Sequence, residues 1–139
     1  MFKKIDWQDV ATLWEAWPEI VAVWVFGSAK EGEVRAGGDV DVAVLGERPF
    51  TLDERLQIVD QLHTQLQFDD IDLTILNEAN VVLRFEAVSG RLLFCRDRQQ
   101  MAAFVSLTAR EYEDEMAQWR MALQFRSQHP VNSNQGADE

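Results

Sequence analysis

The segment FGSAKEGEVRAGGDVDVAV, residues 26–44, decides how this chain is interpreted. An apolar run leads into Gly27 and Ser28, and after ten further residues come Asp39 and Asp41. In an extended strand, residues two positions apart point to the same side. The two carboxylates therefore project together, which raises the question of what they bind.

The sequence on either side of this segment predicts strands. Continuous or alternating apolar residues, many of them β-branched, predict four strands. They cover residues 19–26, 39–45, 70–76 and 91–96. The first is apolar throughout, which is typical of a strand buried on both faces of a sheet.

Helical patterns fill the intervals between the strands. Asp6 can cap a first helix that Pro18 ends, and TLDE at 51–54 reads as a capping box. The helix that this box opens has an expected apolar stripe of Leu52, Leu56, Val59, Leu62 and Leu66. A short helix over about 79–88 and a long one over about 97–126 follow. The fold class is α/β (α+β): a mixed sheet of about four strands flanked by helices, with a long C-terminal helix.

Length and composition exclude several kinds of function. The 139 residues are enough for one ordinary domain, expected over 1–126, with a disordered tail over 127–139. A formal charge of -11 argues against stable nucleic acid binding and against acidic membranes. The single cysteine suits a reducing compartment, and no apolar run reaches membrane-spanning length. These features predict a cytoplasmic protein.

The paired aspartates predict a metal site. Two adjacent carboxylates repel each other unless a cation is present, and hard oxygen ligands suit Mg²⁺. Asp72 lies in DIDL, a strand that resembles the DVDV strand, and can join Asp39 and Asp41 if the two strands are neighbours. Three carboxylates are enough to hold two Mg²⁺ ions about 4 Å apart. Asp69 and Asp70 remain alternatives for the third position.

The Gly-Ser pair supplies a phosphate site. Gly27 allows close approach of a phosphate to the backbone, and Ser28 with the following N–H groups can donate hydrogen bonds to it. Further glycines, including Gly38, keep the loop free of bulky side chains. Phosphate at one end of the loop and metal at the other fit a nucleoside triphosphate with bound Mg²⁺.

The spacing of Gly27-Ser28, ten residues and Asp39-x-Asp41 resembles the signature of the DNA polymerase β-like nucleotidyltransferases. Within that superfamily, the small size and the AKEGEV loop look like the minimal nucleotidyltransferase branch, which includes antitoxins paired with HEPN-domain ribonuclease toxins. The continuation DIDLTILNEANVVLRFEAVSGRLLFCRD, residues 70–97, is also similar to this branch. The resemblance covers about residues 19–97.

The resemblance implies an enzyme that uses ATP and Mg²⁺ to transfer AMP to a tyrosine of a HEPN toxin, within a hetero-oligomer. It implies that Asp39 and Asp41 are metal ligands, and that Asp72 is a third ligand and the base toward the attacking hydroxyl. The nucleotide-binding residues would be Gly27, Ser28, Lys30 and Gly38.

Two positions depart from the family pattern. Gly38 stands where many members have serine before the first aspartate, and Ala29 where many have a basic residue, a role that Lys30 and Arg35 can take.

Two other functions are compatible with the sequence. One is an antitoxin that keeps the fold, has weak or no catalysis and acts by binding alone. The other is a nucleotidyltransferase acting on a small molecule, although such enzymes usually carry a further substrate domain. Crowded carboxylates favour the enzyme, because a binding module has no need of them.

Overall fold

The computed structural model describes residues 2–27, 32–35 and 38–129 of the chain. Its centre is a four-stranded mixed sheet in the order β5-β4-β2-β6. β2 (Ile20–Phe26) pairs antiparallel with both β4 (Val40–Gly46) and β6 (Arg91–Cys95). β5 (Ile71–Ile75) pairs with β4 in parallel. This confirms the predicted α/β fold class with four principal strands.

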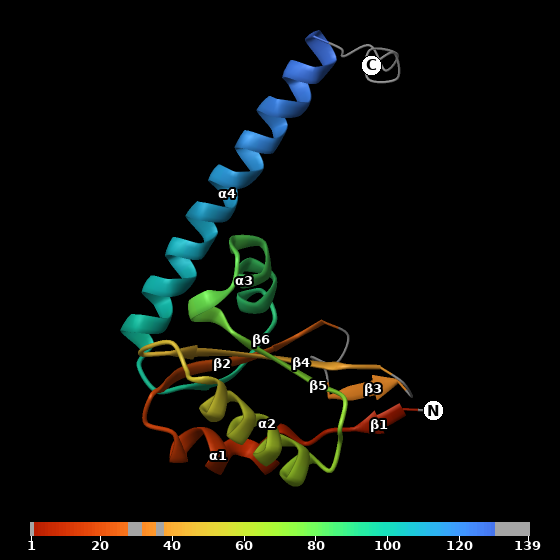
Figure 1. Cartoon of the computed structure of the whole chain (residues 1–139), viewed down its shortest axis with the longest axis vertical. Coiled ribbons are helices and arrows are strands. Elements are labelled where there is room, and N and C mark those ends of the chain that lie inside the picture. Colours follow the sequence, from red (N-terminus) through yellow and green to blue (C-terminus); the bar gives the residue numbers. More distant parts are fainter. Residues whose placement is uncertain (1, 28–31, 36–37, 130–139) are drawn as a thin grey trace.

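Helices cover both faces of this sheet (Figure 1). The 3-10 helix η1 (Trp7–Val10), α1 (Ala11–Ala16) and α2 (Leu52–Leu66) lie on one face. The 3-10 helix η3 (Leu76–Glu78) connects β5 to α3 (Val81–Val88). α3 lies on the opposite face with the start of α4 (Arg98–Gln128).

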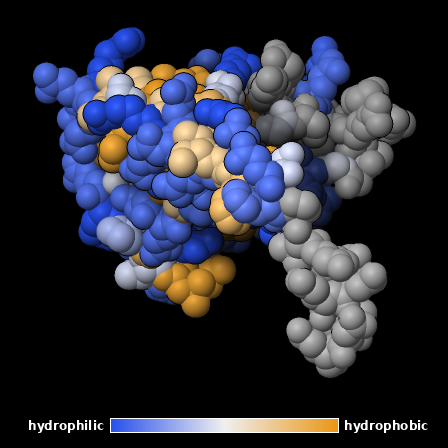
Figure 2. Space-filling model, turned by 90° about the horizontal axis from the view of Figure 1, so that it is seen from above, coloured by the Kyte–Doolittle hydropathy of each residue, from blue (hydrophilic) through white to orange (hydrophobic). Residues whose placement is uncertain are grey.

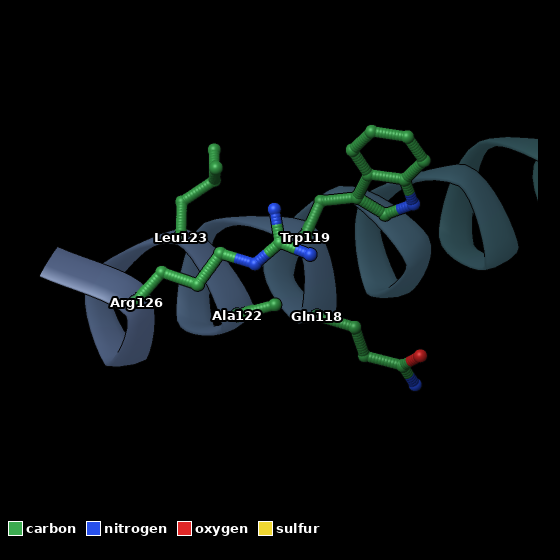
Figure 3. Close-up of a pocket in the computed structure, with 5 residues that line it drawn as sticks. All are labelled: Gln118, Trp119, Ala122, Leu123 and Arg126. Atoms are coloured by element: carbon green, nitrogen blue, oxygen red, sulfur yellow. The ribbon is translucent and has the colours of Figure 1, made fainter. Parts of the chain in front are cut away.

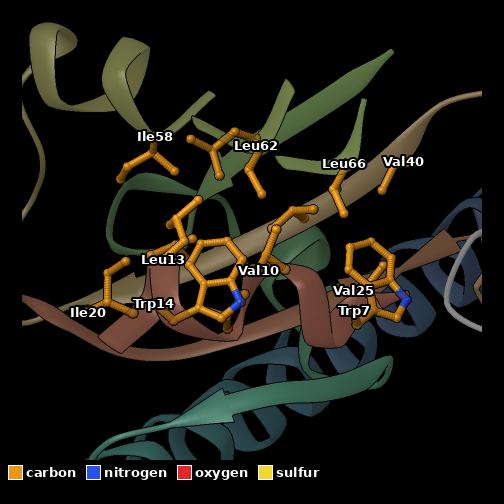
Figure 4. Packing of buried hydrophobic residues seen from close by; sticks show 14 of the residues in the cluster. Trp7, Val10, Leu13, Trp14, Ile20, Val25, Val40, Ile58, Leu62 and Leu66 are labelled. Atoms are coloured by element: carbon orange, nitrogen blue, oxygen red, sulfur yellow. The ribbon is translucent and has the colours of Figure 1, made fainter. Parts of the chain in front are cut away.

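The larger hydrophobic core lies between the sheet and the α1–α2 layer (Figure 4). Val10, Leu13 and Trp14 from the first helical segment meet Ile58 and Leu62 of α2 over the sheet, and all five are at most 3% exposed. Burial of such side chains stabilises the fold by about 1.5–3 kcal/mol each.

A smaller core lies on the other face of the sheet. Trp24 and Ala43 from the strands pack with Ala87 of α3, and Phe104 of α4 contacts the ring of Trp24 at a centroid distance of 6.5 Å. This core fixes α3 and the first turns of α4 over the middle of the sheet.

The capping box that opens α2 is confirmed. The Thr51 hydroxyl accepts from the Glu54 N–H at 3.1 Å, and the Glu54 carboxylate accepts from the Thr51 N–H at 2.9 Å. The predicted apolar stripe is wrong at its start, because Leu52 is 71% and Leu56 57% exposed. The buried stripe instead begins at Ile58, since that side of α2 faces the sheet.

A second sheet was not predicted. β1 (Phe2–Lys4) and β3 (Glu33–Arg35) form an antiparallel pair beside the main sheet. Each has three residues, which is too short for a periodic pattern to reveal it.

The long helix α4 differs along its length. Its first part packs on α3 and β2, whereas its outer part projects away from the sheet (Figure 1). Large apolar side chains on the outer part are 60–68% exposed: Trp119, Met121, Leu123 and Phe125. The surface viewed from above is mainly hydrophilic with separate apolar patches (Figure 2).

The predicted end of the chain differs in part. α4 continues through Gln128, so the first two residues of the predicted tail belong to the helix. Residues 130–139 of that tail lie outside the described residues. Among the helices of the described residues, none has the length and hydropathy needed to cross a membrane.

Candidate active site

Two predicted site residues, Asp41 and Asp72, lie side by side on neighbouring strands at one edge of the sheet, and Asp39 directly precedes the first of these strands. β4 alternates between the two faces: Val40 and Val42 enter the larger core, so Asp41 points to the opposite face. In the register of the parallel pair, Asp41 stands beside Asp72 of β5. The sequence predicted that Asp72 joins the site only if its strand neighbours that of Asp41, and β4 and β5 are neighbours.

Asp41 lies in a strongly acidic environment. Partial burial raises the pKa of its carboxyl above the ordinary value of 3.8, and the negative charges of Asp72, Asp39 and Glu86 raise it further. No Lys or Arg of the described residues forms an ion pair with the three aspartates. The edge therefore carries excess negative charge that a cation would neutralise.

Glu86 is a member of this acidic group that the sequence did not reveal. It lies in α3 and reaches the site because that helix ends over β2. Gly90 permits this close packing, since an added Cβ there would collide with the Val25 carbonyl and lie 2.8 Å from the Cβ of Phe26. No local pattern links Glu86 to the aspartates, because only helix docking brings them together.

Gly27 lies directly against Asp41. Its φ of +74° belongs to the left-handed region, and an added Cβ would lie 2.6 Å from Oδ2 of Asp41. The glycine of the Gly-Ser pair thus leaves space for the carboxylate itself. Its predicted contact with phosphate stays a prediction.

The remaining nucleotide-binding predictions have different outcomes. Gly38 is half-buried immediately before Asp39, which is exposed. Ser28 and Lys30 lie outside the described residues, so their contacts with phosphate stay predictions.

The two alternatives for the third carboxylate precede β5. Asp69 and Asp70 are both exposed, and the Asp70 carbonyl accepts the N–H of Val40 at 2.8 Å. Only Asp72 of these three is paired in register with Asp41 and contributes to its raised pKa. The geometry favours Asp72.

The ligand types at the site suit a divalent cation, but the side chains are not arranged to coordinate one. Carboxylate oxygens are the ligands that Mg²⁺ prefers, and they surround Asp41 without a basic partner among the described residues. As they lie, no three acidic, histidine or cysteine side chains in this part of the chain form a group that could hold a metal ion. Metal binding by Asp39, Asp41 and Asp72 therefore stays a prediction.

A cavity of about 400 Å³ opens beside Asp41 and Gly27. Its opposite side is formed by Phe85 and Glu86 of α3 and by Tyr112 of α4. The rings of Phe85 and Tyr112 are stacked, with centroids 3.9 Å apart and planes 5° from parallel.

Arg84 joins the same two helices. Its guanidinium donates to Glu111 at 3.0 Å. This pairing holds α3 against α4 at the back of the cavity.

A second hollow of about 430 Å³ lies on the outer half of α4 (Figure 3). It is lined by side chains of that helix alone: Gln118, Trp119, Ala122, Leu123 and Arg126. It contains no carboxylate, so it has no part in the chemistry at Asp41.

The family of the chain follows from its sequence as well as its geometry. The model of the family described as Polymerase beta, Nucleotidyltransferase matches residues 8–99, which contain the whole carboxylate site. The chain therefore belongs to this nucleotidyltransferase family. None of the curated proteins compared with the chain matches it significantly.

Several solved structures share the fold. A toxin-antitoxin structure with AMP-PNP superposes with a TM-score of 0.73 at 23% identity, covering 86% of this chain and 97% of that one. The MNT antitoxin complex with a tri-AMPylated HEPN toxin of Shewanella oneidensis gives a TM-score of 0.67 at 22% identity, covering 85% and 92%. At these identities the similarity concerns the fold.

Proposed function

We propose that this protein is an antitoxin that transfers AMP from ATP to a tyrosine of a cognate HEPN ribonuclease toxin in a Mg²⁺-dependent reaction. The observation that carries the proposal is the pairing of Asp41 with Asp72 in register on neighbouring strands, with the charge of Asp39 acting on Asp41 and Gly27 packed against it. Membership of the nucleotidyltransferase family supports the reaction class. Similarity of fold to an antitoxin bound to an AMPylated toxin supports the acceptor.

The residues have separate roles in the proposed reaction. Asp39 and Asp41 would hold Mg²⁺, which would supply positive charge to offset the negative charge that develops on the phosphate during the reaction. Asp72 accepts the proton of the tyrosine hydroxyl. The tyrosine oxygen then forms a bond to the α-phosphorus of ATP, and the bond from that phosphorus to the pyrophosphate oxygen breaks. Pyrophosphate leaves, and AMP remains on the tyrosine.

The surface of the protein suits such a partner. A net charge of -11 would steer the chain toward the basic RNA-binding face expected of a ribonuclease. Added AMP brings negative charge and bulk to the toxin, and both would hinder RNA binding. Absence of stable nucleic acid binding by this chain and a cytoplasmic location stay predictions.

Intact mass spectrometry of the toxin tests the proposal. Incubation with this protein, ATP and Mg²⁺ should add whole AMP units to the toxin and lower its ribonuclease activity. The double variant Asp39→Asn/Asp41→Asn should do neither, and chelation of the metal should have the same result. An unmodified toxin that is nevertheless neutralised by wild-type protein and variant alike would contradict the catalytic proposal.

That contrary result would instead support neutralisation by binding alone. The exposed Trp119 and Leu123 on the outer part of α4 favour this second candidate, because they offer apolar surface with no use in catalysis. Replacing both with polar residues should then abolish neutralisation, whereas the aspartate variants should remain effective.

A further inference from the structure

We infer that the cavity beside Asp41 binds the nucleobase of the nucleotide, and that Tyr112 of α4 supplies the aromatic wall on which the base lies. This inference rests on the proposed function and assigns one part of its substrate to a place in the fold. Its starting point is a cavity of about 400 Å³ that reaches from the carboxylate edge to the joint between α3 and α4. That volume is within the range of sites for small molecules, about 300–1,000 Å³.

The aromatic wall is held in place before any ligand binds. Phe85 and Tyr112 both line the cavity, and their nearly parallel rings fix each other's orientation at a centroid distance of 3.9 Å. The neighbouring residues Arg84 and Glu111 join the same two helices at 3.0 Å. A rigid aromatic surface is suited to a planar base, because stacking on it requires little ordering of the protein.

The charges in the cavity fix the direction of the nucleotide. Asp41 and Glu86 both line it, and their negative charges repel phosphate wherever no cation lies between them. The triphosphate can approach only at the Asp41 end, where the proposed Mg²⁺ is held. The base is then directed to the other end, formed by Tyr112 and Phe85.

The polar groups around the cavity favour a base that donates hydrogen bonds. The Glu86 carboxylate can only accept when ionised. The Ser89 hydroxyl already donates to the Phe85 carbonyl at 2.7 Å, which leaves its oxygen lone pairs to accept. An exocyclic amino group, as in adenine, satisfies these acceptors.

The inference also gives the first part of α4 a role, because Tyr112 belongs to this helix. The family match ends at residue 99, so Tyr112 and nearly all of α4 lie outside the matched region. α4 would complete the nucleotide site and determine base preference, whereas β4 and β5 supply the reacting edge.

Three variants of the full-length protein test the inference. Tyr112→Leu keeps apolar volume but removes the ring, Tyr112→Phe keeps the ring, and Phe125→Leu makes the matched change on the exposed outer part of α4. Calorimetry with ATP and Mg²⁺, and then with CTP, gives the dissociation constants, while thermal unfolding checks that each variant is folded. Since stacking contributes about 1–3 kcal/mol per base, Tyr112→Leu should weaken ATP binding about 5- to 150-fold.

Two further results are expected of the same measurements. Tyr112→Phe and Phe125→Leu should bind ATP as the wild type does. The preference for ATP over CTP should shrink only in Tyr112→Leu, which a purely structural role of the ring would not cause.

Other outcomes would overturn the inference. Unchanged ATP affinity in a folded Tyr112→Leu variant is one of them, and a raised KM for the toxin alone would instead assign the cavity to the acceptor phenol ring. AMP transfer to the toxin is measured separately. If the wild type transfers AMP but ATP binding does not depend on Tyr112, only this inference is contradicted. If ATP binding depends on Tyr112 but no AMP is transferred, this inference is supported and the proposed function is contradicted.

Discussion

The two faces of the central sheet are built from the same strands, and they differ in what the helices leave open. On the α1–α2 face, Val40, Val42 and Val44 of β4 are fully buried beneath α2 (Figure 4). On the α3–α4 face, the intervening residues begin with the half-buried Asp41 and continue with buried Ala43. Helices close the first face along the whole strand and leave the end of the second face uncovered.

This difference shows how one strand can serve stability and chemistry together. Successive residues of β4 face opposite sides of the sheet, so one position lies in the hydrophobic core and the next lies on the face with the acidic edge. Substitutions on the two faces should therefore change different measured quantities. Changes on the acidic edge should alter the reaction, and changes on the closed face should alter the free energy of unfolding.

The largest expected effect is on the acidic edge, at Asp72. Asp72→Asn removes the proposed base and should lower the rate of AMP transfer about 10²- to 10⁴-fold with ATP still bound. Asp70→Asn is the matched control, because this exposed residue lies two positions away and contacts Val40 only through its backbone carbonyl. Single-turnover kinetics measures both. A normal Asp72→Asn rate beside a crippled Asp70→Asn would reverse the assignment.

The closed face should respond in stability instead. Leu62 is completely buried beneath the sheet, so Leu62→Ala should lower the free energy of unfolding by about 2–5 kcal/mol. Urea denaturation measures this loss, and Leu56→Ala on the exposed side of α2 is the control. At temperatures where the variant is folded, its affinity for ATP should match the wild type. A selective loss of ATP binding would remove the functional separation of the two faces.

Gly27 tests the comparison directly, since it follows the last residue of β2 and its missing side chain leaves space for Asp41. Gly27→Ala should strain the backbone at φ +74° and push the Asp41 carboxylate, whose Oδ2 is 2.6 Å from the added Cβ. The strain at this φ should cost about 1–2 kcal/mol of stability, and AMP transfer should fall more than the stability loss explains. Parallel thermal melts and transfer assays separate the two effects. Full activity in Gly27→Ala would show that the carboxylate has room to move.

The sequence predicted the parts of the site that depend on local pattern. The spacing of Asp39 and Asp41 predicted a common direction for two residues of one strand; β4 begins at Val40, so Asp41 lies in the strand, Asp39 lies just before it, and their common direction stays a prediction. The prediction for Asp72 depended on its strand lying beside β4. The similar sequences DVDV and DIDL suggested this arrangement, and the parallel pairing of β4 with β5 confirms it.

The parts that were missed depend on how helices dock. Glu86 and Tyr112 reach the cavity only because α3 and α4 pack over β2, and no sequence period encodes that placement. Leu52 and Leu56 were expected in the core because leucine is apolar, but they lie on the exposed side of α2, whereas Ile58 and Leu62 lie on the side that packs on the sheet. Docking geometry, rather than composition, decided these positions.

The smallest expected effect concerns the charge of Asp41 in the absence of divalent cations. The pKa of Asp41 in the folded protein is raised above 3.8 by burial and by Asp72, Asp39 and Glu86. The unfolded chain, with the ordinary pKa, therefore releases this proton at lower pH than the folded protein does. The stability that protonated Asp41 contributes is complete below pH 3.8 and is lost as the pH rises through the raised value.

Asp41→Asn removes this dependence, because asparagine does not titrate. The variant should gain stability relative to the wild type as the pH rises above 3.8 and through the raised pKa of Asp41, by about 1 kcal/mol or less, since the group is partly exposed and screened. Urea denaturation of both proteins with chelator at each pH gives the difference, in which the titration of unrelated groups cancels. Asp69→Asn, exposed and absent from the causes of the Asp41 shift, is the control. A difference between Asp41→Asn and wild type that stays constant across this range would mean that the acidic edge carries no electrostatic strain, and that the two faces of the sheet differ only in exposure.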